Sequence, residues 1–146
     1  MHLVPALQVT LTIVLLSSFG GMRVNAECLC ARGKPVRVSA VTAGQFLVRY
    51  TLPPVLHVGV TVDDEPEVYS FVFDADGAVC SVGSNRVKVP EARDSIMTAI
   101  RSWRFKPVRA LNEPTCVEIQ KLFVYIRRSR RNTFLVIPGI TDRKAE

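Results

Sequence analysis

Two stretches of the chain, residues 56–62 and 68–74, alternate apolar and polar residues with the period of two that is typical of half-buried strands. The second stretch is rich in aromatic and β-branched side chains, and the Asp-Ala-Asp-Gly sequence at 74–77 has the composition of a tight turn. Residues 78–83 then predict the returning strand of a hairpin. A later apolar run, residues 116–126, predicts a final strand.

The residues between the hairpin and the final strand predict one helix. Pro90 suits the first helical position, where no backbone donor is needed, and Glu91 and Asp94 suit the positive end of the helix dipole. Apolar residues recur at every third or fourth position over 92–103, which predicts a stripe packed against the sheet. We expect Pro107 to end this helix.

The predicted order of strand, strand, helix, strand restricts the topology. A right-handed crossover places the final strand beside the first, which gives the spatial order second, first, final. We therefore expect an α+β fold: a small antiparallel sheet with one helix packed on one face, preceded by extra N-terminal strands at 36–41, 45–50 and 56–62. In this order the final strand is an exposed edge with unpaired backbone groups.

The first 26 residues are typical of a signal peptide. An apolar run from Leu3 to Phe19 is followed by Val24 and Ala26, which suit the two small subsites of a signal peptidase. The alternative is an uncleaved anchor, since a helix of about 25 Å falls just short of a hydrocarbon core of about 30 Å. Both interpretations place the rest of the chain outside the cytoplasm.

The composition agrees with one globular domain. The chain has 146 residues, of which 48% are hydrophobic and 22% charged, so it is too apolar for a disordered protein. The single long apolar run excludes a polytopic membrane protein. We divide the chain into a signal peptide or short anchor (1–26), an N-terminal extension (27–66), a main domain (67–127) and a basic C-terminal tail (128–146).

The formal net charge of +6 is concentrated near the C-terminus. Residues 27–126 carry 12 Lys and Arg against 11 Asp and Glu, whereas residues 127–146 carry 6 against 2. The basic patch consists of Arg127, Arg128, Arg130 and Arg131. We expect it to be solvated, or to contact an anionic membrane surface or an acidic partner. Nucleic acid is not an expected partner, because an exported chain meets little of it.

All four cysteines, Cys28, Cys30, Cys80 and Cys116, follow the predicted signal peptide. In an oxidising compartment an even number of cysteines predicts disulfides. A bond between Cys28 and Cys30 would close a strained ring, and two strand spacings of about 9 to 10 Å keep Cys80 and Cys116 too far apart for a direct bond. We therefore expect one bond from the Cys-Leu-Cys segment to Cys80 and another to Cys116.

Candidate catalytic and metal-binding residues are few. Acid–base catalysis needs a positioned base, and His57 is the one histidine after the predicted signal peptide. Asp74 and Asp76 are better explained as turn residues, and the Cys-Leu-Cys spacing is shorter than that of zinc ligands. We expect no enzymatic activity, no cofactor and no metal.

Three segments resemble, in the right order, the TonB C-terminal domain family. Residues 71–79, Phe-Val-Phe-Asp-Ala-Asp-Gly-Ala-Val, resemble its first hairpin. Residues 99–107, Ala-Ile-Arg-Ser-Trp-Arg-Phe-Lys-Pro, resemble the end of its helix, and residues 117–126 are similar to its closing strand. The structural signature of the resemblance consists of Asp76, Gly77, Trp103, Phe105 and Pro107, and we expect Trp103 to dock the helix on the sheet.

The resemblance implies a periplasmic binding module, linked to TonB-dependent transport, that captures a segment of an outer-membrane transporter or another envelope protein by strand addition. By analogy, the binding edge consists of Val117, Ile119, Lys121, Phe123 and Tyr125. Two alternatives stay open. The tail residues 134–137 could pair with this edge themselves. The chain could also be an exported, disulfide-stapled structural or interaction protein without an energy-transducing role.

Overall fold

The computed structural model describes Cys28, Cys30 and residues 34–53, 64–128, 130 and 133–142. The predicted signal peptide and the predicted strand at 56–62 lie outside these residues. The elements, in chain order, are β1 (Val36–Arg37), α1 (Ala40–Gly44), β2 (Leu47–Arg49), β3 (Glu67–Phe73), β4 (Val79–Arg86), α2 (Pro90–Arg101), β5 (Arg104–Phe105), β6 (Val108–Ala110), β7 (Glu113–Thr115), β8 (Val117–Arg128) and β9 (Thr133–Val136).

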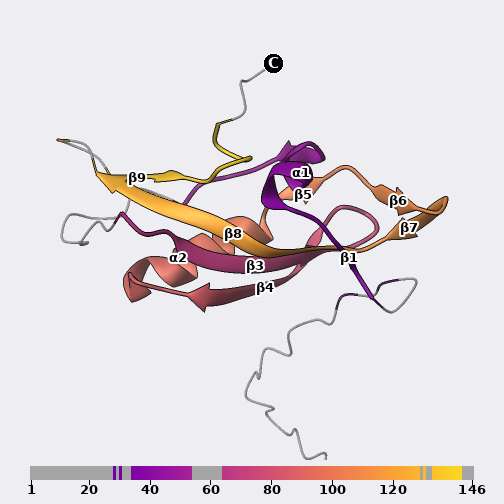
Figure 1. Ribbon diagram of the computed structural model, residues 1–146, viewed down its shortest axis with the longest axis horizontal. Coiled ribbons are helices and arrows are strands. Elements are labelled where there is room, and N and C mark those ends of the chain that lie inside the picture. The colour runs from indigo at the N-terminus through magenta and orange to yellow at the C-terminus, as the bar shows by residue number, and fades with distance from the viewer. Residues whose placement is uncertain are drawn as a thin grey trace, which may run out of the picture.

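The expected α+β class is confirmed, with a sheet that is mixed rather than purely antiparallel (Figure 1). The strand order is β1-β8-β3-β4, and β9 also pairs with β8. Strands β4 and β8 both pair antiparallel with β3, which lies between them, in the spatial order that the sequence predicts. β1 is parallel to β8 and α1 is a second helix, so the N-terminal extension adds to the sheet in a way that its pattern does not predict.

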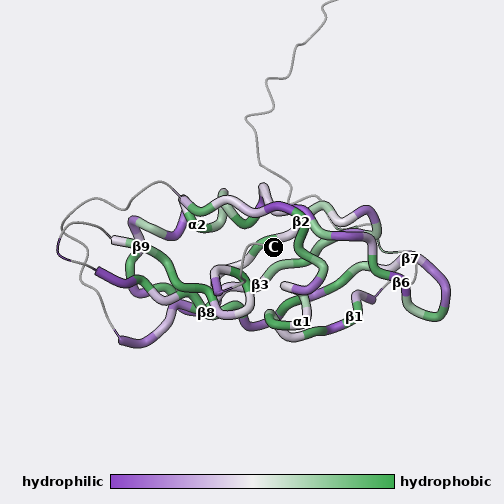
Figure 2. Tube along the Cα trace, turned by 90° about the horizontal axis from the view of Figure 1, so that it is seen from above, coloured by the Kyte–Doolittle hydropathy of each residue, from purple (hydrophilic) through white to green (hydrophobic). Residues whose placement is uncertain are grey.

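Helix α2 covers one face of the sheet, and Figure 2 shows it as a layer beside β3 and β8. Pro90 stands at the start of α2, as predicted. The apolar stripe of α2 is buried, and it shares one core with the inward side chains of β3 and β8. The largest buried members of this core are Trp103, Tyr69, Phe71, Phe73, Ile96, Ile100, Ile119 and Leu122.

Helix α2 ends earlier than predicted. Its last residue is Arg101, and Pro107 follows a short strand instead of ending the helix. The reason is tertiary: the Phe105 N–H donates to the carbonyl of Gly77 at 2.9 Å, and the Phe105 ring stacks on Phe73 with centroids 4.3 Å apart. These contacts hold the chain extended, so that β5 pairs with β2.

The N-terminal strands predicted at 36–41 and 45–50 are each shorter, because a helical turn lies between them. Ser39 begins this turn, and its hydroxyl accepts a hydrogen bond from the Thr42 N–H at 3.1 Å. A serine in this position satisfies a backbone donor that the first turn of a helix leaves open. A side-chain cap therefore accounts for α1 where hydrophobic alternation suggested strand.

A buried carboxylate holds the chain at the start of α2. Glu67 is only 2% exposed. One carboxylate oxygen accepts hydrogen bonds from the N–H groups of Lys88 (3.0 Å) and Val89 (2.7 Å), and the other accepts one from the Tyr69 hydroxyl (2.7 Å). Val89 is the N-cap residue and has no side-chain cap of its own. Glu67 thus supplies from β3 the capping group that α2 lacks.

Stability is expected to fall at alkaline pH because of Tyr69. Burial and the hydrogen bond to Glu67 raise the pKa of Tyr69 above its usual value of 10.0. The unfolded chain therefore releases this proton first, so the stabilisation is complete below about pH 10 and is lost as the pH rises toward the folded-state pKa. We expect the free energy of unfolding to fall by up to about 1.4 kcal/mol per pH unit above pH 10, measured by urea unfolding.

The Tyr69→Phe variant should lose this slope, whereas Tyr50→Phe, at a half-exposed ring outside the Glu67 network, should keep it. An unchanged alkaline slope in Tyr69→Phe would show that another group causes the loss of stability.

Candidate functional site

Strand β8, the expected binding strand, is not a free edge. On one side it pairs with β3. On its outer side, β1 pairs in parallel with Val117 and Glu118, and β9 pairs antiparallel with residues 125–128. The expectation of an open edge over 117–126 is therefore wrong at both ends. The alternative that the tail itself pairs with this strand is confirmed for residues 134–136.

Between these two partners a window stays open on the outer edge of β8. No strand in the described part of the chain pairs with residues 119–124 on that side, which we call the β8 window. At about 3.3 Å per residue, the window is about 20 Å long. A strand edge of this length presents backbone donors and acceptors that another segment can use.

A bulge inside the window changes which side chains share a face. Tyr69 pairs with Leu122, but Phe71 pairs with Ile119, so β8 has one more residue than β3 over this interval. Gln120 and Lys121 are consequently both exposed. The Asn85 side-chain amide donates to the bulged Gln120 carbonyl at 3.1 Å.

The five predicted edge residues therefore do not form one row. Val117 and Ile119 are buried in the core, whereas Lys121, Phe123 and Tyr125 lie on the opposite face of the sheet, away from α2. Strict alternation along a strand would have kept all five on one face, and the extra residue of the bulge reverses the alternation after Gln120.

Two hollows meet at the window. The first, of about 430 Å³, lies beside the outer edge of β8 and is lined mainly by apolar groups of α1 and a residue between it and β1, of the window and of the C-terminal turn: Val38, Ala40, Val41, Phe123 and Pro138. The second, of about 590 Å³, lies on the open face of the sheet over Val68 and Ser70. Gln120, Lys121 and Phe123 line both hollows, so the two adjoin at these side chains.

The C-terminal residues build part of this site instead of forming a separate tail. Leu135, Ile137 and Ile140 are buried in the core, so the boundary predicted at residue 128 is wrong. Gly139 adopts a φ of +84°, and a Cβ at Gly44 would clash with its carbonyl oxygen. The turn after β9 and helix α1 therefore approach each other backbone to backbone, which fixes the far wall of the first hollow.

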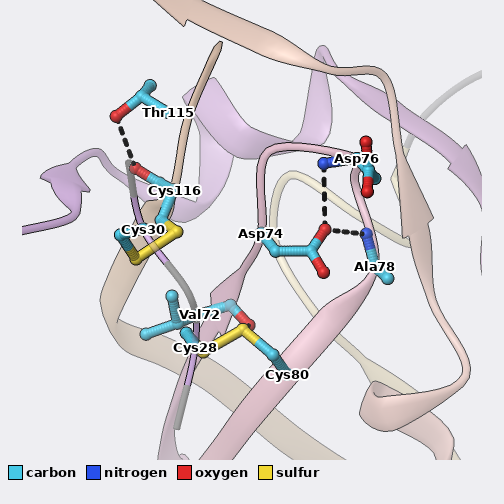
Figure 3. Close-up of a disulfide and its surroundings, with 9 residues drawn as sticks. All are labelled: Cys28, Cys30, Val72, Asp74, Asp76, Ala78, Cys80, Thr115 and Cys116. Carbon is cyan, nitrogen blue, oxygen red and sulfur yellow. Dashed lines mark hydrogen bonds between the residues drawn. A yellow bond between two sulfur atoms is a disulfide. The ribbon is translucent and has the colours of Figure 1, made fainter. Parts of the chain in front are cut away.

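The predicted disulfides are confirmed, and the structure resolves their pairing (Figure 3). Cys28 is bonded to Cys80 of β4, and Cys30 is bonded to Cys116, directly before β8. The two bonds attach the N-terminal segment to the strands on either side of β3. Such bonds are typical of a protein that is exported to an oxidising compartment.

The signature residues have structural roles. The Asp74 carboxylate accepts hydrogen bonds from the N–H groups of Asp76 and Ala78, each at 3.0 Å, and Gly77 has a φ of +86° in the same turn (Figure 3). Trp103 and Phe105 are buried, whereas Pro107 is exposed. The interpretation of the aspartates as turn residues is thus confirmed for Asp74, whose carboxylate organises the turn.

The basic patch is split by the fold. Arg127 forms an ion pair with Asp64 at 3.2 Å, and its guanidinium lies 5.1 Å from the centre of the Tyr125 ring. Arg128 and Arg130 are exposed. Arg131 lies outside the described residues, and so does His57, the one candidate base.

Within the described residues, no three His, Cys, Asp or Glu side chains come together in a group that could hold a metal ion. Helices long and apolar enough to cross a membrane are also absent from this part of the chain. Comparison with protein-family models, with curated proteins and with solved structures finds no match to the chain. Function must therefore be inferred from the geometry of the β8 window and from the sequence resemblance.

Proposed function

We propose that this protein is an exported binding module that captures an extended peptide segment by strand addition at the β8 window. The observation that carries the proposal is the stretch of β8 that no described strand pairs with on its outer side, beside an apolar hollow and between the partners β1 and β9. In strand addition, backbone hydrogen bonds supply affinity and side-chain pockets supply selectivity. The β8 window supplies the backbone groups, and the adjacent hollow supplies a side-chain pocket.

Exposed apolar side chains at the window support this proposal. Val41 of α1 is 59% exposed and Phe123 of β8 is 41% exposed, and both line the outer hollow. A captured segment would cover these groups and remove apolar surface from water. Because β1, β9 and the turn at Gly139 hold the walls of the hollow in place, little ordering of the protein would accompany binding.

The bulge limits what the window can accept. Strand pairing cannot continue through Gln120 and Lys121 without a matching irregularity in the partner. We therefore expect a short extended segment that places one apolar side chain in the outer hollow, rather than a long regular strand.

The partner class follows from the resemblance to the TonB C-terminal domain family. We propose a periplasmic location and a segment of an outer-membrane transporter, or another envelope protein, as the captured ligand. A second candidate function is that of a disulfide-stapled structural protein whose edge is already filled. The pairing of β9 with residues 125–128 favours this candidate, since it covers part of the strand that would otherwise receive a guest.

A substitution at the mouth of the outer hollow tests the proposal. Val41→Glu should weaken binding to a purified TonB-dependent outer-membrane transporter at least about tenfold, because a charge would be buried under the captured segment. Val48→Glu is the matched control, since Val48 is 63% exposed on β2 and does not line the hollow. Binding is measured by calorimetry with the transporter in detergent.

Equal binding by both variants would place the contact elsewhere on the molecule. If the wild-type protein binds no transporter but binds an unrelated envelope protein in a Val41-dependent manner, the window proposal holds and the transporter assignment is wrong. If no segment binds at the window, the structural candidate is favoured.

A further inference from the structure

The β8–β9 hairpin exposes an aromatic ring beside Arg127 on the open face of the sheet. Ile126 pairs with Leu135, and both are buried, so the neighbouring pair of Arg127 and Phe134 faces away from the core. Phe134 is 48% exposed. The pairing with β8 fixes the position of this ring.

The charges around this ring are only partly neutralised. Asp64 pairs with Arg127, which also lies over the Tyr125 ring. No acidic side chain among the described residues forms an ion pair with Arg128 or Arg130, and both are exposed. The sequence adds Arg131 to the same connection between the strands. This end of the hairpin therefore carries a net positive charge, which is complementary to an anionic partner.

The position of the hairpin suits contact with a flat surface. β9 and the end of β8 lie at one end of the long axis of the molecule, and β6 and β7 lie at the other (Figure 1, Figure 2). The hairpin therefore lies at one extremity of the described domain.

We propose that the β8–β9 hairpin is a docking surface for an anionic phospholipid bilayer. Exposed aromatic rings favour the boundary between headgroups and acyl chains, where the ring is apolar and its neighbours stay hydrated. Arginines bind phosphate groups through several donors at once. The disulfides favour a lipid over a nucleic acid as the anionic partner, because an exported protein meets phospholipid headgroups directly. The proposal does not depend on peptide capture at the β8 window.

Vesicle binding by the full chain tests this surface. The wild-type protein should partition onto phosphatidylcholine vesicles that contain phosphatidylglycerol much more strongly than onto phosphatidylcholine alone, and added salt should weaken the difference. Arg128→Glu with Arg130→Glu should reduce partitioning onto the anionic vesicles by about thirtyfold or more, because each basic residue near such a surface changes binding by about fivefold. Co-sedimentation measures the bound fraction.

The matched control is Lys106→Glu with Arg109→Glu, which makes the same change in net charge at exposed positions near β5 and β6. This control should keep partitioning within about threefold of the wild-type value, since β6 lies at the other end of the long axis from the hairpin (Figure 1). Phe134→Ser removes the ring without changing charge, and it should weaken binding to anionic vesicles by about tenfold. Any contribution from residues 1–26 is the same in all these variants.

Several outcomes would overturn the proposal: equal partitioning onto both vesicle types, full binding by the double hairpin variant, or an equal loss in the control. Tighter binding of a single-stranded oligonucleotide or an acidic peptide than of anionic vesicles would assign the surface to that partner instead. Near-ultraviolet circular dichroism checks that each variant is folded. Loss of vesicle binding with intact Val41-dependent peptide capture would separate this surface from the β8 window.

Discussion

Reduction of both disulfides should lower the free energy of unfolding by about 8 kcal/mol in the chain-entropy description. The bond between Cys28 and Cys80 closes a loop of 52 residues, which corresponds to about 4 kcal/mol. With that bond in place, the bond between Cys30 and Cys116 closes an effective loop of about 38 residues, the 36 from position 80 to 116 and the 2 from 28 to 30, for about another 4 kcal/mol.

This loss is large because ordinary domains are stable by only about 5 to 15 kcal/mol in total. We therefore expect most of the reduced protein to be unfolded at room temperature. Urea unfolding with and without a reductant measures the effect, with the fluorescence of the single tryptophan as the signal. A combined loss below about 2 kcal/mol would contradict a stapling role for the bonds.

Single-bond variants divide the effect. Cys28→Ala with Cys80→Ala should cost about 4 kcal/mol and leave the bond from Cys30 to Cys116 intact. The complementary pair, Cys30→Ala with Cys116→Ala, should cost at least as much, since Cys116 is fully buried and its removal also opens space in the core. A cost well below that of the first pair would contradict this order.

Trp103→Ala should cost about 3 to 5 kcal/mol, as expected for removal of a large buried aromatic side chain. Trp103 is 1% exposed, and its ring makes edge-to-face contacts with Phe71 and Tyr50 at centroid distances of 5.8 and 6.4 Å. Its indole N–H donates to the Thr51 carbonyl at 2.9 Å. The side chain thus joins the sheet, the end of α2 and the N-terminal extension.

Two further variants provide costs with which the cost of Trp103→Ala can be compared. Trp103→Phe keeps most of the apolar volume but loses the hydrogen bond to Thr51, so it should cost clearly less than the alanine change. Phe134→Ala removes an exposed ring and should cost under about 1 kcal/mol. Thermal or urea unfolding measures all three, and similar costs for Trp103→Ala and Phe134→Ala would mean that Trp103 is not a core anchor.

The central part of the fold could be predicted because its signals are local. The turn at 74–77 contains the aspartate and glycine that its geometry needs, and Pro90 marks the start of α2. Alternation over 68–74 and the short connection to β4 then fix β3 and β4 as neighbours. A crossover rule with no long-range information was enough to place β8 beside β3.

The candidate site could be predicted only in part, because its walls come from distant segments. Nothing within residues 117–126 indicates that Val36 and Val136 pair with the two ends of β8. Strict alternation of apolar and polar residues also does not predict the bulge at Gln120 and Lys121. Two adjacent polar residues in an apolar run are nevertheless a signal that could have revealed it. Ser39, three residues before Thr42, could likewise have indicated the cap of α1.

The buried Glu67 shows a different limit. It is 2% exposed, and it caps α2 from the neighbouring element. Capping signals are normally sought within a few residues of the helix start. A capping group that is 22 residues from Val89 in the chain becomes visible only once β3 and α2 are placed together.

The two ends of the domain would respond differently to mechanical force. A pull on the N-terminal segment loads the bonds of Cys28 and Cys30, so tension passes through covalent links directly into β4 and the start of β8. A pull on the C-terminus first acts on the turn at Gly139 with the buried Ile137 and Ile140, and then on β9, which backbone hydrogen bonds hold to β8. Tension from the N-terminal side would thus act on covalent bonds, whereas tension from the C-terminal side would act on packing and hydrogen bonds alone.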